Sequence, residues 1–244
     1  MATYKVTLEY DGTAYAGWQR QPDQPTIQAA IETALHRIAH TDISVVGAGR
    51  TDAGVHALGQ VASFRSDRAM TPDQWTRALN ALLPPDISVR LTEHVADGFN
   101  ARRWAQGKLY EYRILNRRPR SALERQRAWH LWGTLHVEHM REGAAFLTGQ
   151  HDFSSFEGPQ AGTDKKVCNL RRIDIIQAGD ILTIHMEADR FLKQMVRAIV
   201  GTLGEVGRGK RFPHAMKDIL EAHDRRAAGY TAPPHGLYLM RVDY

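Results

Sequence analysis

The sequence predicts an α+β fold made of two ferredoxin-like halves, each with an antiparallel sheet covered by helices. The order strand, helix, strand, strand, helix, strand is recognisable in residues 1–98, and it recurs in residues 99–244 with one helix added. A chain of 244 residues is long enough to bury two such cores. We therefore predict domains at 1–98 and 99–244, joined around a central cleft.

In the first half, alternating apolar residues indicate strands, and apolar residues spaced three and four apart indicate helices. Thr71 and Gln74 occupy capping-box positions, and Pro72 occupies the first position of the second helix. The predicted elements are, in order, TYKVTLEY, TIQAAIETALHRIA, ISVVG, QVASFRS, TPDQWTRALNALL and ISVRLTEHV.

The second half follows the polar connection DGFNARRWAQG. The turn AGD between two alternating runs predicts a hairpin, and Gly149 is expected to end the first helix of this half. The predicted elements are, in order, KLYEYRIL, VEHMREGAAFLTG, LRRIDIIQ, ILTIHMEA, RFLKQMVRAIVGTLGEV, HAMKDILEA and the last strand GLYLMRVDY.

Composition favours a polyanionic partner and argues against export, membranes and metals. The net charge is +5, and basic residues occur in short groups such as 117–120. No apolar run reaches about 18 residues, and the single cysteine, Cys168, excludes an internal disulfide. His136 and His139 lack a convincing third ligand, so we predict no metal site. These features suit a cytoplasmic protein.

The segment GAGRTDAGVHALGQ, residues 47–60, is the most unusual stretch. Its small residues allow a ligand to approach the backbone, and before Gln60 its polar side chains are those of Arg50, Thr51, Asp52 and His56. A dinucleotide fingerprint would need glycine at position 52, where a carboxylate would instead repel a pyrophosphate. We predict no nucleotide cofactor, and Asp52 is the candidate for chemistry.

The string GRTDAGVHA resembles the catalytic motif of the tRNA pseudouridine synthase A family. Further segments resemble its other motifs, namely KLYEYRI, FLKQMVRAIVGTL and AGYTAPPHGLYL. The resemblance implies that Asp52 is the catalytic aspartate, Tyr110 the active-site aromatic residue and Arg197 the partner of the carboxylate. It implies that Arg50 takes part in RNA binding and base flipping. Lys193 departs from the Tyr or His that is frequent in similar proteins.

The resemblance further implies a homodimer that needs no cofactor and acts on uridines 38, 39 and 40 of the tRNA anticodon arm. The cleft between the halves would then be catalytic. Pseudouridylation breaks the bond between ribose C1′ and uracil N1 and rejoins the base through C5. One carboxylate can attack C1′, attack uracil C6 or remove a C2′ proton, and the sequence leaves all three open.

A guanidinium such as that of Arg197 favours an ionised carboxylate, and Tyr110 offers a ring for stacking on an extruded base. Candidates for contacts to RNA phosphates are Arg102, Arg103, Lys165 and Lys166.

Two alternatives remain: a non-catalytic RNA-binding protein and a glycoside-cleaving enzyme. The first lacks the expected stacking aromatic residues, and the second needs two carboxylates where only Asp52 stands out.

Overall fold

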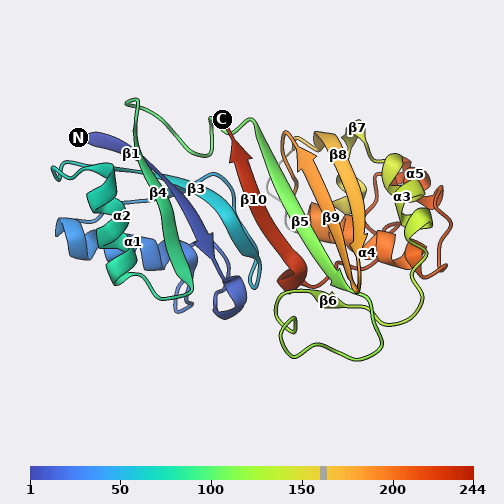
Figure 1. The fold of residues 1–244 in the computed structure, drawn as a ribbon. Coiled ribbons are helices and arrows are strands. Elements are labelled where there is room, and N and C mark those ends of the chain that lie inside the picture. The colour runs from blue at the N-terminus through green and yellow to red at the C-terminus, as the bar shows by residue number, and fades with distance from the viewer. Residues whose placement is uncertain (160–163) are drawn as a thin grey trace. The chain divides into compact units, whose positions relative to one another are not determined.

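The computed structural model describes residues 1–159 and 164–244. The chain divides into two compact units, shown with their elements in Figure 1. Unit 1 contains Met1–Gln106 and Tyr238–Tyr244, and unit 2 contains Gly107–Leu237. By its contacts unit 1 therefore includes residues 99–106 and the last seven residues, which the predicted ranges give to the second half.

Unit 1 contains a mixed sheet and two helices. β1 pairs antiparallel with both β3 and β4, β2 pairs antiparallel with β3, and β10 pairs parallel with β3. These pairings give the spatial order β4-β1-β3-β2. Along the chain the same strands follow the predicted order of strand, helix, strand, strand, helix, strand. The elements are β1 (Ala2–Tyr10), η1 (Gly12–Ala14), α1 (Ile27–Ala39), β2 (Val46–Gly47), β3 (His56–Ser66), α2 (Pro72–Leu82), β4 (Ile87–Val95) and β10 (Leu237–Asp243).

The helices of unit 1 begin where the sequence predicts. The Thr26 hydroxyl accepts the Ala29 N–H and caps α1, and the predicted capping box between Thr71 and Gln74 caps α2. The buried face of α2 includes Trp75, whose ring lies 5.7 Å from the ring of Tyr4. Burying a ring of this size stabilises the fold by about 2–3 kcal/mol.

Two strands of unit 1 have bounds that differ from the prediction. β2 is limited to Val46–Gly47, because α1 side chains take the backbone of Val45: its N–H donates to Glu32 and its carbonyl accepts from Gln28. β3 begins at His56, four residues before the predicted start. The region between β2 and β3 is consequently a short loop of residues 48–55.

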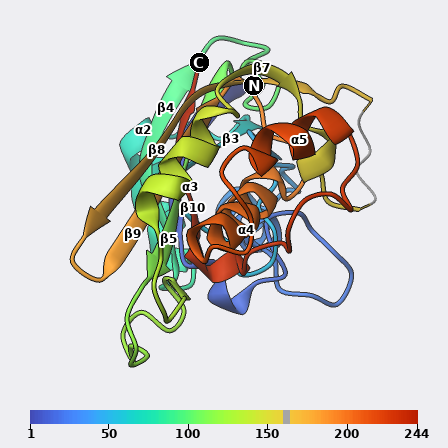
Figure 2. The ribbon, with the colours of Figure 1, turned by 90° about the vertical axis from the view of Figure 1, so that its right-hand side faces the viewer.

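Unit 2 contains a sheet in the order β5-β9-β8-β7, with antiparallel pairs and with β6 parallel to β5. The helices lie on one side of this sheet (Figure 2). The elements are β5 (Gly107–Leu115), β6 (Trp129–His130), α3 (Val137–Ala145), β7 (Gly149–Asp152), η2 (Ser154–Phe156), β8 (Val167–Ala178), β9 (Ile181–Ala188), α4 (Met195–Gly207), α5 (Ala215–Ala222) and η3 (Pro234–Gly236).

The predicted hairpin of unit 2 is confirmed as β8 and β9, and the α+β class is confirmed. Two helix bounds were wrong. α3 ends at Ala145, and Gly149, with φ +112°, begins β7 instead of ending the helix. α4 begins at Met195, not near Arg190, because Gln194 adopts a left-handed conformation with φ 58° that interrupts a helix.

Candidate active site

The loop between β2 and β3 is packed against the preceding chain so closely that two positions require glycine. A Cβ on Gly47 would lie 2.5 Å from the indole of Trp18. A Cβ on Gly17 would lie 2.6 Å from the Thr51 carbonyl oxygen, and Gly17 has φ +98°. The backbone around Asp52 is therefore held in place by direct contact with residues 17 and 18.

Thr51 is the anchor of this loop. Its hydroxyl shares a 2.8 Å hydrogen bond with the Tyr10 hydroxyl, and its carbonyl accepts the Trp18 N–H at 3.0 Å. The amide of Gln60 donates to the Gly49 carbonyl at 3.0 Å and to the Tyr10 hydroxyl at 3.4 Å. Thr51, Tyr10 and Gln60 are all buried, so this network directly supports the backbone next to Asp52.

The Tyr10 hydroxyl stays protonated at neutral pH. Burial raises the pKa of Tyr10 to about 12, although the hydrogen bonds with Thr51 and Gln60 oppose this change. The supporting roles of Tyr10 and Gln60 could not be read from the sequence because their partners are distant along the chain: Tyr10 is 41 residues from Thr51 and 50 residues from Gln60.

Asp52 itself lies in a turn in which the Val55 N–H donates to the Asp52 carbonyl at 3.1 Å. Its side chain is partly exposed, and that of Arg50 is exposed. The Thr51 side chain between them points into the core. Two neighbours of one buried anchor are thus presented outward, where a ligand can reach them.

His56, the last polar residue of the motif, is buried at the start of β3. Its Nδ1 accepts the Gly12 N–H at 3.1 Å and lies 3.0 Å from an Asp11 carboxylate oxygen, and its ring stacks on Tyr238 at 4.8 Å. Acceptance of a backbone N–H requires an unprotonated Nδ1, whereas a protonated Nδ1 would donate to Asp11. In either state His56 connects the loop to η1.

In unit 2, Tyr110 and Tyr112 lie on the same face of β5. Tyr110 is 8% exposed and meets Phe191 edge to face, with ring centroids 5.0 Å apart. Tyr112 is fully buried and donates its hydroxyl to the Pro233 carbonyl at 2.7 Å. Both tyrosines are therefore buried on one face of β5, and Tyr112 fills the core position.

Arg197 lies in the first turn of α4, and its side chain is oriented by hydrogen bonds with the backbone of Ala232. Its Nε donates to the Ala232 carbonyl at 2.8 Å, and the Ala232 N–H donates back to the Arg197 carbonyl at 3.0 Å. Burial raises the pKa of Tyr112, and the positive charge of Arg197 opposes this. Burial also lowers the pKa of His235, against a hydrogen bond with the Ala128 backbone, and Arg197 lowers it further.

Segment 228–236 packs closely against α4 and β5. A Cβ on Gly201 would lie 1.8 Å from the Tyr230 carbonyl oxygen, and the Thr202 hydroxyl accepts the Gly229 N–H at 3.0 Å. A Cβ on Gly236 would lie 2.7 Å from the Tyr112 ring. The glycines of α4 and of this segment therefore serve close packing that keeps Arg197 in one orientation.

The structure thus places Asp52 and Arg50 in unit 1, and Tyr110 and Arg197 in unit 2. Within each unit the predicted residues lie on well-anchored backbone. The joint action of Asp52 with Tyr110 and Arg197 stays a prediction.

The residues proposed to contact RNA phosphates differ in how exposed their side chains are and in whether they form ion pairs within the protein. Arg102 and Arg103 are exposed, and both of their N–H groups donate to the Asn100 side chain at 3.0 Å in a tight turn. Lys165 is exposed, whereas Lys166 forms an ion pair with the largely buried Glu157. Lys166 therefore has a structural role that its sequence context did not reveal.

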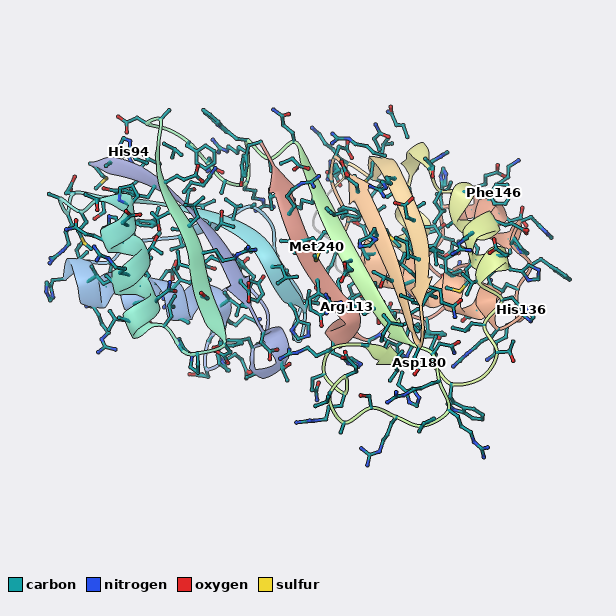
Figure 3. All side chains as sticks on the ribbon, viewed as in Figure 1. His94, Arg113, His136, Phe146, Asp180 and Met240 are labelled. Atoms are coloured by element: carbon teal, nitrogen blue, oxygen red, sulfur yellow. The ribbon has the colours of Figure 1, made fainter. Side chains whose placement is uncertain are left out.

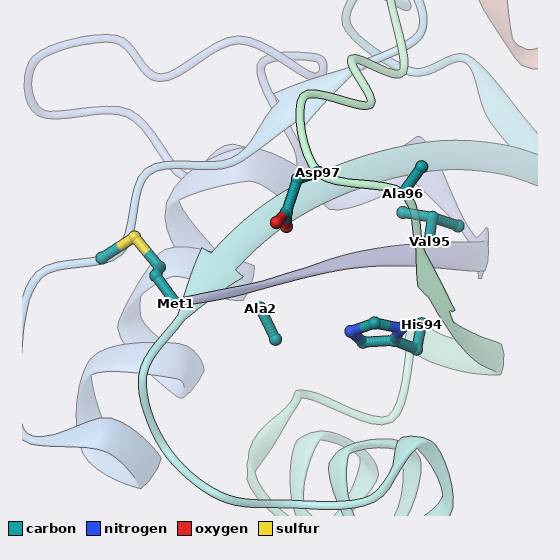
Figure 4. Close-up of a pocket in the computed structure, with 6 residues that line it drawn as sticks. All are labelled: Met1, Ala2, His94, Val95, Ala96 and Asp97. Atoms are coloured by element: carbon teal, nitrogen blue, oxygen red, sulfur yellow. The ribbon is translucent and has the colours of Figure 1, made fainter.

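A pocket of about 440 Å³ opens at the other end of β1, where it is lined by Met1, Ala2, His94, Val95, Ala96 and Asp97 (Figure 4). Ala2 and Tyr10 are the two ends of β1, roughly 25 Å apart at the usual rise of a strand. The pocket is therefore remote from the Asp52 loop.

Within residues 1–159 and 164–244, no three histidine, cysteine or acidic side chains gather closely enough to hold a metal ion. In the same part of the chain, every helix is too short or too polar to cross a bilayer.

Comparison with known proteins places these features in context. A family model described as tRNA pseudouridine synthase matches residues 7–102 and 144–244. The tRNA pseudouridine synthase A of Myxococcus xanthus is 46% identical over 100% of this chain and 92% of its own length. That of Geotalea daltonii is 43% identical over 100% of both chains. The match to the crystal structure of an archaeal box H/ACA sRNP Nop10-Cbf5 complex covers 91% of this chain and 59% of that chain, at 14% identity and with a TM-score of 0.37.

The contact between Gly17 and Thr51 predicts a difference between two glycine substitutions. Gly17 and Gly98 both have positive φ in unit 1, but a Cβ on Gly98 would have no neighbour within 4 Å. We expect Gly98→Ala to cost about 1 kcal/mol through backbone strain alone and Gly17→Ala to cost about 3 kcal/mol or more. Thermal unfolding measures both. Equal melting temperatures for the two variants would show that the loop does not depend on this contact.

Proposed function

This chain belongs to the tRNA pseudouridine synthase family, and we propose that it isomerises uridines 38, 39 and 40 of the tRNA anticodon arm with Asp52 as the catalytic carboxylate. Membership makes the chain an isomerase that converts uridine to pseudouridine in tRNA. The choice of uridines, the role of Asp52, the homodimer and the cytoplasmic location belong to the proposal.

The observation that carries the proposal is the setting of Asp52. Its carboxylate is partly exposed on a loop whose neighbouring residue, Thr51, is held by buried hydrogen bonds. A reaction that cleaves one bond and forms another on the same base needs no redox partner. It needs a carboxylate held in a fixed position relative to ribose C1′ and the uracil ring. The anchored loop supplies such rigidity.

Tyr110 and Arg197 complete the proposed site. We propose that Tyr110 stacks on the extruded uracil and that the guanidinium of Arg197 keeps the Asp52 carboxylate ionised and oriented. The bond from Arg197 Nε to the Ala232 carbonyl supports this role because it fixes the plane of the guanidinium. Arg50, exposed two residues before Asp52, is proposed to occupy the space left by the extruded base or to hold its phosphate.

The proposal predicts that Asp52→Asn and Asp52→Ala both lose turnover by at least about a thousandfold, because neither side chain can act as nucleophile or base. The measurement is release of tritium from anticodon-arm transcripts labelled at uridine C5, since rejoining through C5 expels that hydrogen. Wild-type release should be unaffected by a metal chelator. Substantial turnover by either variant rejects Asp52 as the catalytic group.

Arg197→Lys should lower kcat by about tenfold or more, because one ammonium cannot bond the Ala232 carbonyl and also present the paired donors of a guanidinium. Arg211→Lys is the matched control, since Arg211 also donates to a backbone carbonyl of unit 2, that of Ala227. The control should keep wild-type kcat. If both variants keep it, Arg197 has another role.

Removal of the Tyr10 hydroxyl should lower kcat roughly tenfold to a hundredfold by loosening Thr51 and so displacing Asp52. Tyr4→Phe is the control: Tyr4 lies on the same strand and face, is similarly buried, and donates to the Met70 carbonyl at 3.0 Å. Both substitutions should cost about 1 kcal/mol of stability. Steady-state kinetics and melting curves together test this, and equal kcat values for Tyr10→Phe and Tyr4→Phe would refute the supporting role of Tyr10.

A further inference from the structure

The loop between β5 and β6, residues 116–128, carries a concentration of charge that the proposed site does not use. Residues 117–127 contain five arginines and one acidic residue, Glu124. The arginines are Arg117, Arg118, Arg120, Arg125 and Arg127. We call residues 116–128 the arginine loop.

The two ends of the arginine loop are tied to unit 2. The Asn116 N–H donates to the Asp180 carbonyl at 2.7 Å, and the Asn116 side chain donates to the carbonyls of Leu131 and Gly133. The His130 ring bonds the Arg117 carbonyl at 2.9 Å. Figure 3 labels Asp180, in the turn between β8 and β9, at the base of the loop.

The middle of the loop is also ordered by its own hydrogen bonds. The Ser121 hydroxyl accepts the Glu124 N–H at 3.2 Å, and the Glu124 carbonyl accepts the N–H groups of Arg127 and Ala128. Leu123 is 86% exposed, so this part projects into solvent and does not fold back onto unit 2. A projecting loop that is already ordered loses little entropy when a ligand binds.

Four of the five arginines divide into supporting and displayed side chains. Arg117 pairs with Asp180 at 3.3 Å and bonds the Pro119 carbonyl, which commits it to the base of the loop. Arg118, Arg120 and Arg125 are exposed, and the Arg125 guanidinium also donates one hydrogen bond, to the Ala122 carbonyl at 2.8 Å within the loop. Guanidinium groups bind phosphate oxygens through paired hydrogen bonds, so three of them on one ordered loop suit a chain of phosphates.

The position of the loop in unit 2 separates it from the proposed chemistry. β5 runs from Tyr110 directly into the loop, and six residues of strand from Tyr110 to Asn116 span roughly 20 Å. The loop would therefore contact RNA phosphates some distance from an extruded uracil stacked on Tyr110. Such contacts add affinity without taking part in bond breaking.

We propose that the arginine loop binds the phosphate backbone of the RNA substrate at a distance from the isomerised uridine, through Arg118, Arg120 and Arg125. This inference rests on the proposed function, because it takes Tyr110 as the residue that stacks on the isomerised uridine. It adds a binding surface that the residues suggested from the sequence, Arg102, Arg103, Lys165 and Lys166, do not include.

The test compares two triple variants that remove the same charge. The first is Arg118→Gln/Arg120→Gln/Arg125→Gln. The control is Arg65→Gln/Arg68→Gln/Arg77→Gln, which changes exposed arginines of unit 1. The dissociation constant for a full-length tRNA transcript is measured by fluorescence anisotropy at salt concentrations from about 50 to about 300 mM. Affinity that comes from phosphate contacts falls steeply over about this range. Single-turnover tritium release at saturating enzyme reports the chemical step.

We expect the arginine-loop variant to bind at least about tenfold more weakly than wild type at low salt. The slope of its plot of log Kd against log salt concentration should be smaller than the wild-type slope by about 2. Its saturated rate should stay within about twofold of wild type, while the control keeps both the wild-type affinity and slope. An unchanged slope, or an equal loss in the control, overturns the proposal. Absence of tritium release from the wild-type enzyme would instead contradict the proposed function.

Discussion

The position of Asp52 depends on one buried hydrogen bond, that between the hydroxyls of Tyr10 and Thr51. The loop carrying Asp52 buries apolar side chains only near its two ends, at Ala48 and Val55, so its centre has no hydrophobic contact of its own. Polar bonds from β1 and β3 and the close approach of Gly17 replace that contact. A loop of small residues, which would otherwise be free to move, thereby acquires the rigidity that bond cleavage at a defined atom requires.

Unit 2 solves the corresponding problem for Arg197 by a different means. A long cationic side chain has many rotamers, and ordering it costs up to about 2 kcal/mol. Reciprocal backbone and side-chain bonds with Ala232 offset that cost, and the packing of Gly201 against Tyr230 holds the partner segment. Each unit therefore supports one charged group. In unit 1 buried hydrogen bonds support the backbone next to Asp52, and in unit 2 the closely packed segment 228–236 orients Arg197.

Much of this architecture could be predicted from the sequence because local signals determine it. Thr71, Pro72 and Gln74 predicted the start of α2, and the AGD turn predicted the β8–β9 hairpin. The start of α4 could not be predicted, because the apolar spacing continues through Gln194 although its backbone leaves the helical region.

The candidate site shows the same division. The motif around Asp52 is local and was identified from the sequence, whereas its support is not local. Tyr10 and Gln60 lie 50 residues apart and meet only when β1 and β3 pair. The role of Lys166 was equally hidden, because its partner Glu157 is brought to it by the fold. The local pattern identified the residue that we propose to do the chemistry, and the tertiary structure identifies what holds its loop.

We propose that the Asp52 carboxylate performs the chemistry and is not needed to bind the RNA. The most direct measurement is pseudouridine content in tRNA bound to excess Asp52→Asn protein, read by nucleotide-resolved chemical labelling alongside the dissociation constant of the same complex. We expect wild-type affinity with no pseudouridine at positions 38, 39 or 40. Pseudouridine formed there at near wild-type rates, or a failure of the variant to bind tRNA, would contradict it.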